Sequence, residues 1–586
     1  MERQLNEKII AAFESAGVPT DHAAVKLSDR PELADYQCNG AMAAAKAMKK
    51  NPREIASEVA AAFDGGSLCE PPEIAGPGFL NIRLRDSALA RAAEDMAAQE
   101  RLGVDQPDHP QRIILDYGGP NVAKPLHIGH LRSAIIGESI KRILRFAGHE
   151  VAGDIHMGDW GYQMGLIIAS LGEEQPDLPY FDSGAKPDDY PSDPPFTLAD
   201  LERIYPEASA RAKEDDDFRD KALAATNSLQ SGHPGYRALW QHIMDLSVAD
   251  LKRNYARLNV DFDWWKGESD VQDLIGPMVE QMKADGYARI DDGALIVDVA
   301  KEDDKKEIPP CMILKSDGSA LYATTDLATL KDRRAWDPDR IVYIVDKRQG
   351  LHFEQVFRCA KKTGITPEET ELDFRGFGTM NGPDGQPYKT REGGVMRLSA
   401  LIDEINAYMV EKVRENETVA ADAAEETARI IGLAALKYGD LSNQASKDYV
   451  FSLERFASSD GNTGPYLLYT IVRIKSILDK YGQESGAASD DAGMNEPATP
   501  SERDLMLDLV RFPDSFADAA EQMAPHKICA YLYGLANHFN GFYRDVKILA
   551  EPDPVRKTGY IALLKLTLRV LEQGIDLLGF SAPDRM

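Results

Sequence analysis

Apolar and polar positions along the chain follow two different periods, and the order in which these periods occur divides the chain into parts. Within residues 1–105, helical spacing covers 5–16 and 52–63, and strict alternation covers 79–84, as expected of two helices and a strand. A proline-containing segment with the composition of a linker follows at 106–110. The pattern therefore predicts a small α+β domain over residues 1–105.

From residue 112 the pattern is typical of a parallel α/β fold. An apolar run at 113–115, an amphipathic segment at 131–147 and a second apolar segment at 151–157 follow one another. This order predicts a strand–helix–strand unit, whose ligand lies at the carboxyl ends of the parallel strands. We expect a Rossmann-type core with an inserted subdomain. The expected core covers residues 106–420, and the insertion covers about 173–260. Further strands of the core are expected at 294–299, 341–345 and 372–377.

Helical spacing dominates the last part of the chain. It predicts a helical connector over residues 421–461 and an all-α domain over residues 462–586. The segment 483–500 differs, because it is rich in Gly, Ala, Ser, Asp and Pro. That composition predicts a loop between helices.

The loop between the first strand and the first helix of the core carries the strongest chemical signal. Residues 120–130 read P-N-V-A-K-P-L-H-I-G-H. Backbone N–H groups and the dipole at a helix N-terminus attract anions, and His127 and His130 can donate hydrogen bonds to phosphoryl oxygens. Gly129 allows a flat purine or sugar to approach the backbone. A single H-x-x-H usually marks two ordinary histidines, but the added Lys124, prolines and glycine favour a phosphate-binding loop.

Composition narrows the class of protein further. A chain of 586 residues with 43% hydrophobic and 28% charged residues is typical of a soluble protein of several domains. No apolar run approaches the roughly 20 residues that span a bilayer, and the N-terminus lacks a signal peptide's pattern. The five cysteines lie far apart, which argues against structural zinc and disulfides. We therefore expect a cytoplasmic protein without membrane contact or structural metal.

The net charge of −29 bears on nucleic-acid binding. Binding of phosphate backbones depends on Lys and Arg, so this charge argues against indiscriminate association with nucleic acid. Local basic faces can still bind RNA on an acidic protein.

Several further segments, read with the 120–130 loop, resemble class I aminoacyl-tRNA synthetases and, within them, arginyl-tRNA synthetases of bacterial type. In chain order these segments are G-D-W-G at 158–161, G-E-S at 267–269, Tyr322 with Asp326, R-Q-G-L-H-F at 348–353, K-T-R at 389–391 and G-N-T-G-P-Y at 461–466. The resemblance covers nearly the whole chain. It implies ATP-dependent ligation of L-arginine to the 3′ end of tRNA(Arg) through an arginyl-adenylate, with release of AMP and pyrophosphate. It also implies Mg²⁺ bound with ATP, and tRNA bound before the adenylate forms.

The resemblance also implies the residues of the site. Those for ATP are Lys124, His127, Gly129, His130, Lys389 and Arg391, of which Lys124, His127, His130 and Lys389 are the expected catalytic groups. Those for arginine are Asp116, Asn121, His130, Glu268, Tyr322, Asp326 and Gln349. Carboxylates suit this ligand because a guanidinium is a planar fork of donors. Tyr322 and Asp326 are four residues apart, so on a helix they share one face. For His352 two interpretations stay open, an ordinary structural role and packing near the adenine.

Two departures from the family pattern bear on these assignments. The class motif K-M-S-K-S has two lysines, but residues 389–393 read K-T-R-E-G and lack the second. We hypothesise that Lys124 supplies the missing charge. Gly118 and Gly119 stand where relatives carry two serines, so a hydroxyl role at these positions is in doubt.

RNA contacts are implied at both ends of the chain. Phe79 and Asn81 match positions at which the family's N-terminal domain contacts the outer corner of tRNA, and alternate residues of a strand share one face. The competing interpretation is that Phe79 belongs to the core and Asn81 to a turn. The all-α domain resembles an anticodon-binding domain, although aromatic residues at helical spacing in 466–481 and 530–543 are as expected of packing.

Three other classes are compatible with parts of the pattern. A small nucleotidylyltransferase shares the histidine loop but has no helical C-terminal third. A non-catalytic RNA-binding paralogue tends to lose the histidines or lysines that are present here. Another class I synthetase, for example for cysteine, usually needs zinc ligands that this cysteine spacing does not offer. We therefore expect a monomeric arginyl-tRNA synthetase.

Overall fold

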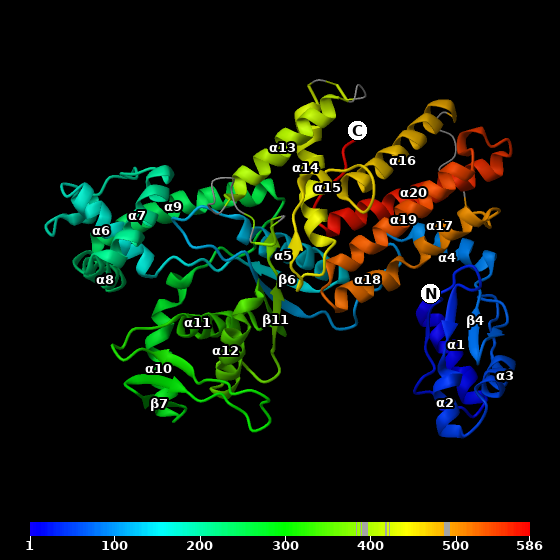
Figure 1. Ribbon diagram of the computed structural model, residues 1–586, viewed down its shortest axis with the longest axis horizontal. Coiled ribbons are helices and arrows are strands. Elements are labelled where there is room, and N and C mark those ends of the chain that lie inside the picture. The colour runs from blue at the N-terminus through cyan, green and yellow to red at the C-terminus, as the bar shows by residue number, and fades with distance from the viewer. Residues whose placement is uncertain (383, 387, 389–395, 416–418, 421, 486–492) are drawn as a thin grey trace.

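The computed structural model describes residues 1–382, 384–386, 388, 396–415, 419–420, 422–485 and 493–586. Its N-terminal end is an α+β unit at one side of the molecule (Figure 1). Leu5, Ile9 and Phe13 are buried on one face of the first helix, because residues three to four apart share a helix face. They join the core of an antiparallel sheet of order β1-β2-β4-β3. The elements are α1 (Glu2–Ser15), β1 (Val25–Leu27), β2 (Tyr36–Cys38), α2 (Gly40–Met48), α3 (Pro52–Ala62), β3 (Glu73–Ala75), β4 (Phe79–Ile82) and α4 (Asp86–Ala98).

A parallel four-stranded sheet of order β11-β10-β5-β6 forms the centre of the molecule. Ile113, Ile114 and Leu115 of the inner strand β5 are all buried, as expected of a parallel strand covered on both faces. Helix α5 connects β5 to β6, and α12 connects β10 to β11. The predicted parallel α/β core is therefore confirmed. Its elements are β5 (Arg112–Tyr117), α5 (Ile128–Ala147), β6 (Glu150–Asp154), β10 (Arg340–Asp346), α12 (Gly350–Lys362) and β11 (Glu371–Phe377).

A helical subdomain interrupts the core after β6 and projects to the side opposite the N-terminal unit (Figure 1). It begins at Tyr162, before the predicted start at about residue 173. Its helices are α6 (Tyr162–Glu174), α7 (Leu198–Glu214), α8 (Asp216–Gln230) and α9 (Pro234–Arg257). The helices α7 and α9 pack against α6 and α8, so the insertion has its own apolar contacts.

The prediction of a core strand at 294–299 is wrong in its placement. Residues Ala294–Val297 form β8, but β8 belongs to a separate antiparallel sheet of order β7-β8-β9. The reason is local: β7 and β8 are joined by Asp292 and Gly293, both with positive φ, and a two-residue turn of this kind makes an antiparallel hairpin. The elements of this subdomain are η3 (Glu268–Val271), α10 (Gln272–Ala284), β7 (Ala288–Asp291), β9 (Cys311–Leu314) and α11 (Tyr322–Arg333).

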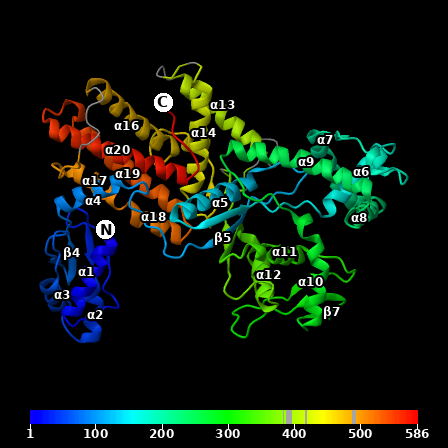
Figure 2. The ribbon, with the colours of Figure 1, turned by 180° about the vertical axis from the view of Figure 1, so that it is seen from behind.

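The C-terminal part is a helix bundle that contacts both the N-terminal unit and the central α/β core (Figures 1 and 2). Its elements are α13 (Leu398–Arg414), α14 (Ala424–Leu441), α15 (Leu453–Phe456), α16 (Gly464–Ser485), α17 (Pro500–Val510), α18 (Phe512–Glu521), α19 (Pro525–Asp545) and α20 (Pro554–Leu577). A short parallel pair, β12 (Met380–Asn381) with β13 (Tyr449–Val450), ties the bundle to the core.

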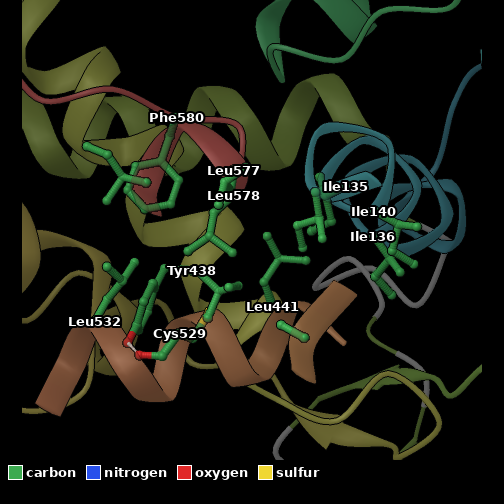
Figure 3. Packing of buried hydrophobic residues seen from close by; sticks show 14 of the residues in the cluster. Ile135, Ile136, Ile140, Tyr438, Leu441, Cys529, Leu532, Leu577, Leu578 and Phe580 are labelled. Carbon is green, nitrogen blue, oxygen red and sulfur yellow. Dashed lines mark hydrogen bonds between the residues drawn. The ribbon is translucent and has the colours of Figure 1, made fainter. Parts of the chain in front are cut away.

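Helix α5 is the element that joins the core to this bundle. Figure 3 shows Ile135, Ile136 and Ile140 of α5 in one buried cluster with Tyr438 and Leu577 of the bundle. The Tyr438 hydroxyl donates to the Cys529 carbonyl oxygen at 2.9 Å, and Ser139 of α5 donates to the Leu577 carbonyl oxygen at 2.9 Å. The middle of α5 is therefore anchored to the bundle by apolar packing and by a hydrogen bond.

A buried ion pair ties the N-terminal unit to the bundle. Arg503 of α17 donates to both carboxylate oxygens of Asp35 at 2.8 Å, and to Asp86 at 2.8 Å. Arg503 and Asp35 are almost completely buried. Removal of either partner would leave the other charge buried without compensation, which is costly.

Candidate active site

Two histidines cap the N-terminus of α5 and fix each other's orientation. The Gly129 backbone N–H donates to His127 Nδ1 at 3.0 Å, and the His127 backbone N–H donates to His130 Nδ1 at 3.1 Å. The two ring centroids are 3.9 Å apart. Because each Nδ1 accepts a hydrogen bond, the neutral rings carry their proton on Nε2. Both histidines can therefore donate from Nε2 to an anion.

Electrostatics keeps both rings neutral near pH 7. Burial, and then the Lys124 charge, lowers the pKa of His127. Burial, then His127 and Lys124, lowers the pKa of His130 to about 3. Lys124 itself is exposed to solvent. It therefore adds positive charge beside the two histidines without filling the space in front of them.

A cavity of about 280 Å³ lies in front of this helix end, close in size to a small ligand pocket. Its walls come from α5 and from the carboxyl ends of β10 and β11, the place where ligands bind in open parallel sheets. Arg132 forms one wall, and its own side chain is held by Asp440 at 3.0 Å and the Gly378 carbonyl oxygen at 2.7 Å. The lining residues are His127, Ile128, Gly129, Arg132, Asp346, Arg348, Phe377, Gly378, Thr379, Met380 and Tyr388.

The loop that carries Asn121 runs beside the G-D-W-G segment. The Val122 N–H donates to the Gly158 carbonyl oxygen, and the Gly158 N–H donates to the Pro120 carbonyl oxygen, each at 3.0 Å. A Cβ atom at Gly158 would lie 2.1 Å from Asn121 Oδ1, so any other residue here would force the Asn121 side chain to move. Gly118 has φ +83 and Phe262 would lie 2.7 Å from its Cβ. Serine would therefore be strained at Gly118.

Asp116 lies at the end of β5 and is bound to an arginine of the protein itself. Arg333, the last residue of α11, donates to Asp116 at 2.5 Å, to Asp154 at 2.7 Å and to the Tyr343 hydroxyl at 2.8 Å. Burial raises the pKa of Asp116, and the Arg333 charge opposes this. Arg333 thus fixes α11 to three strands of the parallel sheet, β5, β6 and β10.

The carboxylates of Asp159 and Asp326 lie close enough to that of Glu268 for their charges to interact, and we call these three residues the acidic hollow. Asp159 accepts from the Ser269 hydroxyl at 2.5 Å and from the Ser269 N–H at 3.0 Å, which places the neighbouring Glu268 at the start of η3. Burial, then the charges of Asp159 and Asp326, raise the pKa of Glu268 to about 7. A bound cation would offset the repulsion among these carboxylates and would therefore favour the ionised form of Glu268.

Residues from α11 and α12 complete this hollow. Asp326 lies one turn after Tyr322 on α11, and Tyr322 is 76% exposed at the helix start. Gln349 is exposed immediately before α12. His352 Nε2 lies 2.5 Å from Asp326 Oδ2, so His352 stands beside the acidic hollow. Packing of His352 near the adenine stays a prediction.

Two of the expected residues cannot be placed. Lys389 and Arg391 lie outside the residues that the structure describes. The chain that follows them returns to the histidine loop, because the Ile128 N–H donates to the Met396 carbonyl oxygen at 3.1 Å. Arg397 then pairs with Glu202 of the helical insertion at 2.7 Å. Residues 396–397 thus connect the histidine loop to the insertion.

Phe79 and Asn81 lie on β4 of the N-terminal unit, in a different part of the molecule from the two histidines (Figure 1). Asn81 is buried and accepts from Gln37 Nε2 at 3.0 Å, whereas Phe79 is half-buried. The two side chains share one face of the strand, but the Asn81 carbonyl is already paired. Within the described part of the chain, no group of three or more His, Cys, Asp or Glu could hold a metal ion, and none of the helices is long and apolar enough to span a bilayer.

A parallel sheet with a histidine-capped helix after its first strand, a pocket at the strand ends and a helical insertion defines the class I aminoacyl-tRNA synthetase architecture. Models of three protein families match successive parts of the chain. The class I (R) tRNA synthetase catalytic domain matches residues 93–453, the arginyl-tRNA synthetase N-terminal domain matches residues 3–84 and the DALR anticodon-binding domain matches residues 467–586.

Individual proteins agree with these matches. An arginine–tRNA ligase of Agathobacter rectalis is 55% identical over 99% of both chains. The arginyl-tRNA synthetases of Plasmodium falciparum and Thermus thermophilus share the fold, with TM-scores of 0.82 and 0.80 at 22% and 24% identity, over the full length of this chain and 99% and 100% of theirs. The chain belongs to the arginyl-tRNA synthetase family. The fold class that the sequence predicts is confirmed.

Proposed function

We propose that this chain ligates L-arginine to the 3′ end of tRNA(Arg) in two steps. The arginine carboxylate attacks the α-phosphorus of ATP, which forms arginyl-adenylate and releases pyrophosphate. A terminal ribose hydroxyl of the tRNA then attacks the adenylate carbonyl carbon, and AMP leaves. The observation that carries this proposal is the pairing of a neutral histidine couple at the α5 N-terminus with an acidic hollow across the strand ends.

ATP occupies the cavity beside α5 in this proposal. The Nε2–H groups of His127 and His130 donate to phosphate oxygens, where negative charge grows during attack, and Gly129 lets the nucleotide approach the backbone. Lys124, Lys389 and Arg391 supply the positive charge for the pyrophosphate. Mg²⁺ arrives with ATP as part of the substrate, held mainly by phosphate oxygens.

Arginine occupies the acidic hollow. Asp326 and Glu268 accept from the guanidinium, and Tyr322 and Gln349 form the walls. Asn121, Asp116 and His130 hold the α-amino and carboxylate end, which points toward ATP. Asp116 keeps one carboxylate oxygen for this purpose, because Arg333 occupies Oδ2.

The tRNA contacts both ends of the chain. Residues 1–105 bind its outer corner, with Phe79 as a stacking platform and Asn81 beside it, and residues 462–586 bind the anticodon. On the bundle, Arg473 lies 4.7 Å from the Tyr469 ring centre and 5.3 Å from that of Tyr543. Stacked rings and a cation suit unpaired bases. The core spans 106–420 and the connector 421–461, and we place the protein in the cytoplasm as a monomer.

Pyrophosphate exchange with each of the twenty amino acids, with and without total tRNA, tests this proposal. We expect exchange with arginine and with no other amino acid, and only when tRNA is present. Exchange with another amino acid, or equal exchange without tRNA, would contradict it. The Lys124→Ala variant tests the compensation of the missing second lysine: adenylate formation should fall by roughly tenfold or more, in line with the loss of a charge-assisted contact. Nearly intact activity would refute that role.

A further inference from the structure

We infer that His352 is a positioning residue that selects arginine by fixing the plane of the Asp326 carboxylate. This inference rests on the proposed function, because it takes the acidic hollow as the guanidinium site. His352 Nε2 lies 2.5 Å from Asp326 Oδ2. An ionised carboxylate only accepts hydrogen bonds, so the imidazole donates from Nε2.

The imidazole itself has a defined orientation. The His352 ring meets the Phe353 ring edge-on, with centroids 5.1 Å apart and an angle of 83°. Phe353 is buried and contacts Tyr343 with ring centroids 4.7 Å apart. The His352 imidazole therefore packs against aromatic side chains of α12 and β10, which fix its orientation. It can thus hold the Asp326 carboxylate in one place.

The helix that carries Asp326 is fixed independently. Arg333, two turns further along α11, binds Asp116, Asp154 and the Tyr343 hydroxyl. Tyr343 thus contacts both supports, since it lies beside Phe353 and accepts from Arg333. With the helix position set by Arg333, the remaining freedom of Asp326 is rotation of its own side chain.

Repulsion between the carboxylates favours one direction of rotation of the Asp326 side chain. Asp326 lies near Glu268, whose pKa is raised first by burial and then by the negative charges of Asp159 and Asp326. The Asp326 side chain is 22% exposed, so without a donor it can turn toward water and away from the other carboxylates. The His352 hydrogen bond opposes this movement.

A fixed carboxylate plane matters for one class of ligand in particular. A guanidinium donates two parallel N–H bonds and needs both oxygens in its own plane, whereas an ammonium is a point charge without such a plane. His352 occupies one lone pair of Oδ2, which leaves Oδ1 and a second lone pair of Oδ2 for the guanidinium. His352 therefore favours arginine over lysine.

Two substitutions of His352 test the inference in the full-length enzyme with tRNA and saturating ATP. His352→Phe keeps a ring but removes the donor, and we expect the KM for arginine to rise roughly tenfold, as for the loss of one hydrogen bond to a charged group. The kcat and the KM for ATP should change less than twofold. His352→Gln keeps a donor at similar reach and should recover most of the lost affinity. His149→Phe is the matched control, because His149 is also half-buried and makes a hydrogen bond with the Gln111 backbone far from the hollow.

The outcomes separate this inference from the proposed function. If Asp326→Asn raises the KM for arginine but His352→Phe does not, the inference fails and the proposed function stands. If Asp326→Asn also leaves that KM unchanged, the hollow is not the arginine site. Equal losses in kcat and in the KM for ATP would indicate a merely structural role and overturn the inference. Should His352→Phe unfold, the same comparison between His352→Gln and His352→Ala decides.

Discussion

Arginine binding should depend on pH through Glu268. Burial and the charges of Asp159 and Asp326 raise the pKa of Glu268 to about 7 in the empty site. The guanidinium is charged at all relevant pH values and favours the ionised carboxylate. Below pH 7 the Glu268 proton must therefore leave when arginine binds, and the KM for arginine should rise as the pH falls.

The magnitude follows from this pKa. With a single titrating group at about 7, the KM for arginine should be about tenfold higher at pH 6 than at pH 8. His127 and His130 do not interfere in this window, because their pKa values are both lowered. Glu268→Gln should abolish the pH dependence and raise the KM at pH 8 by roughly 10- to 100-fold, as for loss of a hydrogen bond between two charged groups.

The assay is tRNA-dependent pyrophosphate exchange at saturating ATP, with arginine varied between pH 6 and 8. Glu280→Gln is a suitable control, because Glu280 is an exposed carboxylate paired with Lys283 on α10. Two results would refute the reasoning. The first is a KM for arginine that is flat from pH 6 to 8 in the unmodified enzyme, and the second is an unchanged slope in Glu268→Gln.

Three further predictions concern the histidine cap of α5, the interface between the N-terminal unit and the bundle, and the contact of Gly158 with the Asn121 loop. His130→Ala should lower the rate of adenylate formation by roughly 10²-fold, as for one donor to a developing charge; a loss below threefold in single-turnover assays would contradict its role. Arg503→Ala should destabilise the N-terminal unit by about 3–5 kcal/mol, because Asp35 is left buried and charged; unchanged hydrogen exchange in β4 would count against this. Gly158→Ala should cost about 1–3 kcal/mol of stability through its clash with Asn121; wild-type melting behaviour would show that the loop adapts.

Local patterns were sufficient for much of the fold. The helix and strands around 113–157 follow from apolar periodicity, and the loop before α5 follows from the residue types it contains. The histidine cap was not predicted from the sequence, although it is local, because His127 and His130 bond to backbone groups two and three residues away. The placement of β8 failed, although the Asp292–Gly293 pair is a short-range hairpin signal that could have corrected it.

The residues that sequence reasoning missed act over long distances in the chain. Arg333 binds Asp116, which is 217 residues away, and His352 binds Asp326, 26 residues away. No period or motif links such residues, since their approach depends on how α11 and α12 pack on the sheet. The spacing of Gln349 and His352 offered a weak signal, because residues three apart share a helix face.

The sequence by itself determined the family and the order of its parts, because these depend on residue type and near neighbours. Only the tertiary structure decided that Arg333 binds one carboxylate oxygen of Asp116, that burial and nearby charges raise the pKa of Glu268 and that His352 contacts Asp326. Burial and charge–charge distances control these properties, and both arise when separate segments of the chain are packed together.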